Sequence, residues 1–393
     1  MNEKFSEDFS RWERDGRLRE AVVADYGNAP LIEKNHNQYI NVSSGNYMGM
    51  AQHPQVIKVA QQSLEQYGLS SGGSPLVCGY STEQDVLTQR LAQFFETERA
   101  LVVSSGYLAG LAVIPSLMED GDTIFSDSLN HASLIDACRL SKARVVIYPH
   151  GDVNSLEERI KKDSSRRRMI VSDGIFSMDG DIAPLPQLLE LAEQYRAWLL
   201  VDDSHAIGVL GQQGGGSWQY FDLHSPWIIL ASSLSKGLGI HGGVVAGSAD
   251  VIQYLQNTAR SWIFSSSLPP SWCAAGTTSL DILENSLPER QQLWHHSVYF
   301  RTHLQQMGHR TIATAAPEIP IIPWIIGPEN DTLQVTNHLR QGFIWASAIR
   351  PPSVPINSSR IRFALTASHT QEQIDYVLGV IQKLNLSFSP NKD

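Results

Sequence analysis

The sequence has few cysteines and no long apolar run. Its three cysteines, Cys78, Cys138 and Cys273, are far apart and form no CxxC pair, which indicates reduced thiols rather than disulfides or a zinc site. No apolar stretch approaches the roughly 18 residues needed to cross a bilayer. The polar start, MNEKFSEDFSRWERD, has the pattern of neither a signal peptide nor a transit peptide. We therefore expect a cytoplasmic protein that does not enter a membrane.

Positive charge is also scarce, since the formal net charge is −10. Such a balance argues against binding to nucleic acid. The one basic cluster, residues 161–168, lies between a helical pattern and an apolar strand pattern and is interpreted as a solvated loop. No nucleic-acid partner is expected.

Several functional motifs are missing or misplaced. There is no GxSxG elbow for a serine hydrolase, and His295, His296 and His303 lie on a polar helical pattern without HExxH, so no metal site is expected. The string Gly237–Gly242 matches GxGxxG, but it leads into the apolar run Val244–Ala246 rather than a helix. We treat this match to the dinucleotide fingerprint as false.

The central part of the chain alternates helical and strand patterns. At 393 residues it is long enough for two or three structural units. Because the strand patterns are uniformly apolar, they predict an α/β fold with a mostly parallel sheet in a large domain. We expect an N-terminal arm (1–45), this large domain (46–285) and a smaller α+β C-terminal domain (286–393). The predicted strands are Ala100–Val103, Thr123–Phe125, Arg144–Tyr148, Met169–Ser172, Trp198–Val201 and Trp227–Ala231.

Polar or small residues follow five of these strands. Because ligands of open α/β sheets bind outside the carboxyl ends of the strands, we expect these residues to form one site. They are Ser104–Tyr107, Ser126 and Asp127 with Asn130 and His131, Asp173–Ser177, Asp202–His205, and Ser232 and Ser233 before Lys236.

Lys236 is the candidate nucleophile of that site. A lysine usually lies on a solvated face. This one follows an apolar strand in a turn rich in serine and glycine, where poor hydration would lower its proton affinity and make it a Schiff-base amine.

Three neighbours have two interpretations each. Asp202, at the end of WLLV, needs a cation, which could be a protonated pyridine or a structural arginine. His205 could donate to a phenolic oxygen or be a satisfied core histidine. Ser104–Tyr107 could bind a phosphate at a helix N-terminus or simply cap the helix.

Six strings resemble the α-oxoamine synthase family of pyridoxal-phosphate (PLP) enzymes, in that family's order and over nearly the whole chain. The string Ala348–Pro355, together with Arg360–His369 after it, is most similar to the corresponding segment of the branch that makes 8-amino-7-oxononanoate in biotin synthesis. The strings are Ser70–Ser81, Asn130–Ala137, Asp173–Asp181, Val201–Gly211, Ser233–Gly239 and Ala348–Pro355.

The resemblance implies the aspartate-aminotransferase fold (PLP fold type I) and a role for each matching residue. Lys236 matches the lysine that binds PLP covalently, and Asp202 the partner of the pyridinium nitrogen. His131 matches the imidazole stacked on the ring. His205 and Ser177 match contacts to the phenolic oxygen. We expect Lys236, His131, Asp202 and His205 to be catalytic.

The resemblance also assigns the phosphate and substrate contacts. Ser105, Gly106, Tyr107 and Ser233 match the phosphate cradle. Ser266 lies in a segment similar to the one that reaches the phosphate of the other subunit. Arg362 matches the arginine that binds the substrate carboxylate, while Arg350 and Arg19 are weaker matches near the acyl substrate.

The implied reaction is the decarboxylative condensation of L-alanine with pimeloyl-CoA, or with pimeloyl-carrier protein, by a homodimer. Four positions depart from the family pattern near the substrate, namely Gly45, Asp173, Gln84 and Thr88. They leave open a sister activity that uses glycine, serine or another acyl-CoA. A further alternative is a catalytically silent homologue that acts as an interaction subunit.

Overall fold

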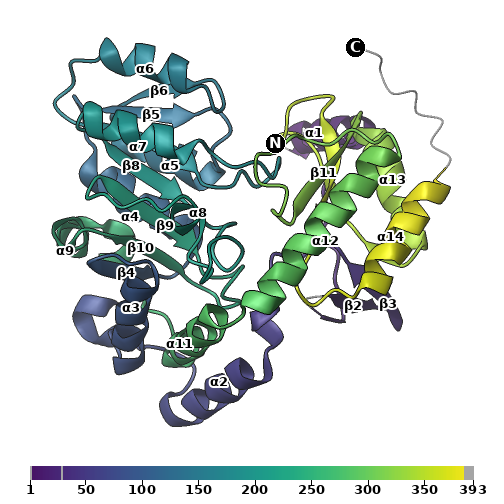
Figure 1. The fold of residues 1–393 in the computed structure, drawn as a ribbon, viewed down its shortest axis with the longest axis horizontal. Coiled ribbons are helices and arrows are strands. Elements are labelled where there is room, and N and C mark those ends of the chain that lie inside the picture. Colours follow the sequence, from purple (N-terminus) through teal and green to yellow (C-terminus); the bar gives the residue numbers. More distant parts are fainter. Residues whose placement is uncertain (1, 28–29, 385–393) are drawn as a thin grey trace. The chain divides into compact units, whose positions relative to one another are not determined.

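The computed structural model describes residues 2–27 and 30–384, which form two compact units (Figure 1). The larger unit comprises Gly45–Ser177 and Asp181–Arg290. The smaller unit contains Met178–Gly180 and the described parts of residues 1–44 and 291–393. The division into an arm and two domains at residues 45 and 285 stays a prediction.

The larger unit is built on a seven-stranded sheet with the order β4-β10-β9-β8-β7-β5-β6. Only β10 runs antiparallel to its neighbours, β4 and β9, so the predicted mostly parallel sheet is confirmed. The strands are β4 (Arg99–Val103), β5 (Thr123–Asp127), β6 (Arg144–Tyr148), β7 (Arg168–Asp173), β8 (Trp198–Asp202), β9 (Ile228–Ser233) and β10 (Gly243–Gly247).

Helices cover this sheet and supply its core (Figure 1). Helix α4 packs on β9 and β10, and Val113, Ile229 and Val245 are fully buried there. Burial of one such side chain contributes roughly 1.5–3 kcal/mol. The helices of this unit are α2 (Pro54–Tyr67), α3 (Thr82–Phe94), α4 (Gly106–Leu117), α5 (Ala132–Ser141), α6 (Val153–Lys161), α7 (Leu185–Gln194), α8 (Ser217–Tyr220), α9 (Ala249–Thr258), α10 (Arg260–Ile263) and α11 (Pro270–Glu284), with a 3₁₀ turn at Met50–Gln52.

One stretch is more regular than the sequence suggests. The high glycine and serine content of residues 68–79 predicts an irregular loop, yet Pro75–Gly79 forms a single π turn. The backbone N–H groups of Val77, Cys78 and Gly79 all donate to the Ser74 carbonyl, at 3.1, 3.3 and 2.9 Å. Proline at the start fixes φ for this turn without the loss of a needed donor.

The smaller unit combines two small sheets with helices. One sheet has the order β1-β2-β3-β12 and the other β11-β14-β13. In the first, Ile344 of β12 pairs in parallel with Ile40 of β3, which joins distant parts of the chain. Its elements are α1 (Asn2–Arg14), β1 (Tyr26–Gly27), β2 (Leu31–Lys34), β3 (Asn37–Asn41), most of α12 (Leu287–Gln306), β11 (Ile321–Gly327), α13 (Glu329–Gln341), β12 (Ile344–Trp345), β13 (Ala348–Ile349), β14 (Ser359–Ala364) and α14 (Gln371–Lys383).

Among the described residues, no helix combines the length and apolar character needed to cross a membrane. Within the same residues there is no group of three or more histidine, cysteine or acidic side chains arranged to hold a metal ion. Cys78, Cys138 and Cys273 are all free thiols.

Candidate active site

A cavity of about 140 Å³ lies in the larger unit, and residues that follow the strands β4, β5, β7, β8 and β9 line it. The structure thus brings together the side chains that the sequence placed at the strand ends. The lining residues are Gly106, Tyr107, His131, Ser133, Asp173, Ile175, Ser177, Asp202, Ser204, His205, Ser233 and Lys236.

Lys236 lies in a tight turn between β9 and β10. The turn is closed by hydrogen bonds from Leu234 N to Gly242 O (3.0 Å) and from Gly239 N to Lys236 O (3.1 Å). Gly237 is required there, because a Cβ atom on it would lie 2.0 Å from the Ile207 carbonyl oxygen. Gly237 therefore allows close packing beside Lys236, which is consistent with the interpretation that the GxGxxG match is not a dinucleotide site.

Gly45, one of the departures from the family pattern, lies beside the lysine. A Cβ atom on it would lie 3.3 Å from Lys236 Cγ. A side chain at this position would press on the lysine stem, and glycine leaves that space open.

Asp202 ends β8 and is mostly buried. Its Oδ1 accepts hydrogen bonds from Ser204 N (3.1 Å) and Ser204 Oγ (2.5 Å). Ser204 Oγ in turn accepts from Ser233 N at 2.8 Å, so the ends of β8 and β9 are tied together. The carboxylate is thereby fixed at the cavity wall, where it can hold a cationic partner.

His205 is held by a partner that the sequence analysis missed. Its Nδ1 shares a 2.7 Å hydrogen bond with the hydroxyl of Tyr47, whose ring is fully buried. The bond fixes the orientation of the imidazole at the cavity. No sequence pattern indicates Tyr47, because nothing local links residues that are 158 positions apart.

His131 caps the N-terminus of α5 and faces the cavity. Its Nδ1 accepts from Ser133 N (3.3 Å) and lies 2.8 Å from Ser133 Oγ. Burial lowers the pKa of His131, and the lysine charge of Lys236 lowers it further against the opposing effect of Asp202. The lowered pKa favours the neutral imidazole.

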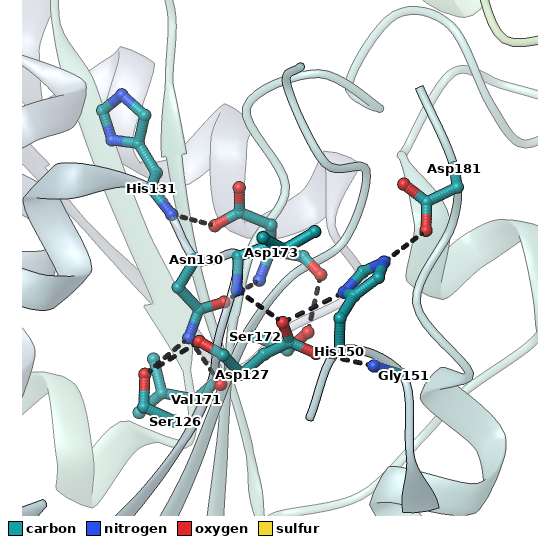
Figure 2. Close-up of polar contacts among 11 residues, drawn as sticks. Ser126, Asp127, Asn130, His131, His150, Gly151, Val171, Ser172, Asp173 and Asp181 are labelled. Carbon is teal, nitrogen blue, oxygen red and sulfur yellow. Dashed lines mark hydrogen bonds and ion pairs between the residues drawn. The ribbon is translucent and has the colours of Figure 1, made fainter. Parts of the chain in front are cut away.

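Asp173, which also lines the cavity, holds the backbone of His131 (Figure 2). Its Oδ1 accepts from the backbone N–H of His131 at 3.1 Å, and its own N–H donates to Asn130 Oδ1 at 2.9 Å. Full burial, and then the nearby charge of Asp202, raise the pKa of Asp173 well above its ordinary value.

The N-terminus of α4 contributes Gly106 and Tyr107 to the cavity lining. This helix follows β4, whereas Asp202 and Asp173 end β8 and β7, farther along the sheet. Ser105 caps the helix by accepting from Leu108 N at 3.4 Å. A Cβ atom on Gly106 would lie 2.4 Å from Ser233 Cβ, so only glycine allows this close approach. The N–H groups of the first turn have no partner within the helix, and with the Ser233 hydroxyl they make a donor set suited to a phosphate.

Two predicted phosphate contacts lie outside the cavity lining. Ser105 acts as the helix cap, and Ser266 lies beside Ser104, whose Oγ donates to the Ser266 carbonyl at 2.9 Å. Neither is among the lining residues. Their roles stay predictions.

The three predicted substrate arginines belong to the smaller unit. Arg19 donates to the carbonyls of Arg350 (3.0 Å) and Pro351 (2.8 Å), and Arg350 donates to Gly16 and Leu18. Arg362 lies on β14 and is partly exposed. Their substrate roles stay predictions.

Two residues before Arg362, on the same strand, lies Arg360. Its side chain is buried, forms an ion pair with the partly exposed Asp179 and donates to the Met178 carbonyl at 3.2 Å. The alternation of polar and apolar residues over 360–365 predicts that both arginines lie on one face of a strand, but it does not indicate this pair.

A mostly parallel sheet with a lysine, an aspartate and two histidines around a cavity at its strand ends is the architecture of PLP-dependent enzymes with the aspartate-aminotransferase fold. Comparison with known proteins agrees. The family model "Aminotransferase class I and II" matches residues 37–381. The chain belongs to this family and, within it, to the 8-amino-7-oxononanoate synthase family.

The relatives that place it there match nearly end to end. An 8-amino-7-oxononanoate synthase of Lysinibacillus sphaericus is 40% identical over 385 residues, which is 98% of each chain. The 8-amino-7-oxononanoate synthase 2 of Bacillus subtilis is 44% identical over 374 residues, 93% of this chain and 95% of its own. The predicted resemblance is confirmed.

Solved structures confirm the predicted fold. A serine palmitoyltransferase from Sphingomonas wittichii superposes with a TM-score of 0.89 at 29% identity, covering 96% of this chain and 95% of its own. An 8-amino-7-oxononanoate synthase from Francisella tularensis has a TM-score of 0.77 at 26% identity, covering 88% and 97%.

Proposed function

We propose that this protein is a PLP-dependent C-acyltransferase that condenses L-alanine with a pimeloyl thioester, forming 8-amino-7-oxononanoate, CO₂ and the free thiol carrier. The observation that carries the proposal is the convergence of Lys236, Asp202, His131 and His205 on one cavity beside the N-terminus of α4. The names of the relatives support the choice of substrates.

The residues present fit the cofactor. Asp202 would hold the proton on the pyridine nitrogen, and His131, being neutral, would stack on the ring. His205 and Ser177 would contact the phenolic oxygen. PLP, when bound, supplies an electron sink for negative charge at the alanine Cα.

The polar ends of the cofactor have donors at the other side of the cavity. Gly106 and Tyr107 would donate backbone N–H groups to the phosphate, with the Ser233 hydroxyl beside them. Lys236 would bind the aldehyde carbon and, once displaced by alanine, take the proton from the alanine Cα as general base. Arg362 would hold the alanine carboxylate in a bidentate pair, which fixes the direction of the Cα–H bond.

The cofactor part of the proposal is tested by visible absorption. Protein incubated with PLP and then gel-filtered is expected to keep a visible band. Lys236→Ala removes the band while PLP still binds non-covalently, and Lys162→Ala, at an exposed lysine, leaves it unchanged. Wild-type protein that neither carries nor takes up PLP would refute the proposal.

The substrate part is tested by release of CoA. L-alanine, glycine and L-serine are each paired with pimeloyl-CoA, acetyl-CoA and palmitoyl-CoA. We expect the pair of L-alanine and pimeloyl-CoA to give the highest kcat/KM. A higher value for glycine or serine, or for another thioester, would assign a sister activity instead.

We also propose a homodimer in the cytoplasm, with CoA or an acyl carrier protein as the carrier. Three strongly exposed apolar side chains near Ser266 support the dimer, namely Leu76, Val77 and Phe264, since exposed apolar groups of this kind favour a protein contact. Light scattering after gel filtration should give twice the 43.6 kDa chain mass. A monomer at micromolar concentration would contradict it.

A further inference from the structure

His150 lies in the loop after β6 and outside the cavity lining, and none of the roles above uses it. Its Nδ1 donates to Asp127 Oδ1 at 3.0 Å and its Nε2 donates to Asp181 Oδ2 at 2.8 Å (Figure 2). Because ionised carboxylates only accept, both ring nitrogens carry protons and the imidazolium bridges two anions.

The first carboxylate organises the loop that carries His131. Asp127 ends β5, and its two oxygens also accept from Leu129 N (2.8 Å) and Gly151 N (2.9 Å). Asn130, next in this loop, donates to the Val171 carbonyl at 2.8 Å. The backbone is thus fixed up to the point where His131 enters the cavity.

Asp181, which carries the second carboxylate, lies in the loop that carries Ser177, and backbone hydrogen bonds close this loop. The Asp181 carbonyl accepts from Phe176 N at 3.0 Å, and Ala183 N donates to the Gly174 carbonyl at 2.9 Å. These bonds fold the two arms of the loop onto each other. The arm before Ser177 also contributes Ile175 to the cavity.

His150 contacts this second loop at another point as well. The Phe176 ring meets the imidazole edge to face, with ring centroids 4.3 Å apart. One histidine therefore holds both loops, by charge on each and by an aromatic contact on one.

We propose that His150 is a positioning residue that joins the loops of His131 and Ser177, so that both face the cavity before a cofactor arrives. Groups that orient the residues in direct contact with a ligand commonly change affinity about 10- to 100-fold. The inference rests on the proposed function only in taking His131 and Ser177 as cofactor contacts.

The first test uses cofactor-free protein and hydrogen–deuterium exchange. His150→Gln is expected to speed exchange about fivefold or more in peptides covering 127–131 and 174–183, because the loops open locally more often. His224→Gln, which removes an exposed histidine paired with Asp222, is the matched control and leaves both peptides unchanged. Unchanged exchange in His150→Gln would overturn the inference.

A second variant keeps the test decisive if His150→Gln does not fold. Asp181→Asn removes one of the two anions and leaves Asp127 with His150. We expect faster exchange in 174–183 and unchanged exchange in 127–131. If Asp181→Asn speeds exchange equally in both peptides, or in neither, then His150 does not hold the two loops through separate contacts, and the inference is contradicted.

The third test is a double-mutant cycle on PLP affinity. His150→Gln and Asp181→Asn are each expected to weaken PLP binding about tenfold, and the double variant no more than about tenfold, because both substitutions remove the ion pair between His150 and Asp181. In His150→Gln the pH midpoint of the visible band also shifts. An additive loss of about a hundredfold, or unchanged affinity and midpoint, would overturn the inference.

The two proposals fail separately. Wild-type protein that does not bind PLP would refute the proposed function, and the exchange experiments on cofactor-free protein would still decide the role of His150. Wild-type protein that binds PLP, with His150→Gln equal to it in exchange and affinity, would refute the role of His150 alone.

Discussion

Asp173 and Asp202 are direct partners across β7 and β8 but have different surroundings. Asp173 lines the cavity but is deeply buried, and its raised pKa favours the neutral carboxyl. Asp202 faces the cavity and is held by Ser204. Two acids one strand apart can therefore serve two purposes, support and chemistry.

This difference predicts opposite outcomes for the same substitution. Asp173→Asn keeps an acceptor for His131 N and resembles the neutral acid, so turnover should stay within about threefold of wild type. Asp202→Asn removes the charge that holds the pyridinium proton and should lower turnover more than about a hundredfold. Steady-state rates with L-alanine and pimeloyl-CoA check both. Equal losses in the two variants would contradict the assignment.

Gly106 allows a second prediction at the scale of one residue. In Gly106→Ala the new methyl would meet Ser233 Cβ at 2.4 Å, which should lower the free energy of unfolding by about 1–3 kcal/mol and weaken PLP binding. Gly379 in α14 has open space around it, so Gly379→Ala should stabilise by about 0.5–1 kcal/mol. Urea unfolding measures both. A stable Gly106→Ala with unchanged PLP affinity would disprove the close approach.

Individual site residues were predictable in part. Lys236, Asp202 and His131 follow apolar strands, and a parallel sheet necessarily brings such positions to one edge. Tyr47 and His150 were missed because their partners are set by packing between distant segments. No local pattern indicates which carboxylates a lone histidine will meet.

At the scale of elements, the alternation of helices and strands was predictable because buried parallel strands are apolar throughout. The antiparallel direction of β10 was not predictable, because a short apolar run does not indicate in which direction the strand runs in the sheet. Helix α11 was also missed. It packs against both α2 and α3, so its apolar residues form no single stripe.

Arg290 connects two elements of the larger unit. It is fully buried, and it donates to the Gly211 carbonyl at 3.4 Å and to the Leu283 carbonyl at 3.0 Å. Burial lowers its pKa to about 10. The loop that contains Gly211 also contains Gly208. A Cβ atom on Gly208 would lie 3.1 Å from the Cα atom of Gly237, so this loop packs against the turn that carries Lys236.

Arg290→Met should therefore destabilise the unit and loosen the turn of the lysine. Unpaired carbonyls left in the interior should lower the free energy of unfolding by about 3 kcal/mol. Arg139→Met, at an exposed arginine paired with Asp136, should change it by less than about 0.5 kcal/mol. The midpoint of urea unfolding and the intensity of the PLP band are the measurements. A variant with the wild-type midpoint would show that the carbonyls find other donors.

At the scale of the whole molecule, no sequence pattern indicates that described residues before position 45 share a compact unit with those after position 290. The parallel pairing of Ile40 with Ile344 is one of the contacts that join them. A strand of two residues such as β12 is too short to leave a periodic pattern. Pairings over such distances depend on the fold of everything between them.

The pH dependence of overall stability provides the last prediction. Burial lowers the pKa of His150, but hydrogen bonds and charge from Asp127 and Asp181 outweigh it and raise the pKa to about 10, from an ordinary 6.5. Because the folded-state pKa is the higher one, the stabilisation is complete below pH 6.5 and is lost as the pH rises through about 10.

His150→Gln should therefore be less stable than wild type at pH 6 by about 1–2 kcal/mol, after solvent screening of the partly exposed ring. The difference should shrink at pH 8 and nearly vanish above pH 10, while His224→Gln should follow wild type throughout. Urea unfolding of cofactor-free protein at these pH values measures it, and a difference that stays constant or grows with pH would rule out an imidazolium between the two aspartates.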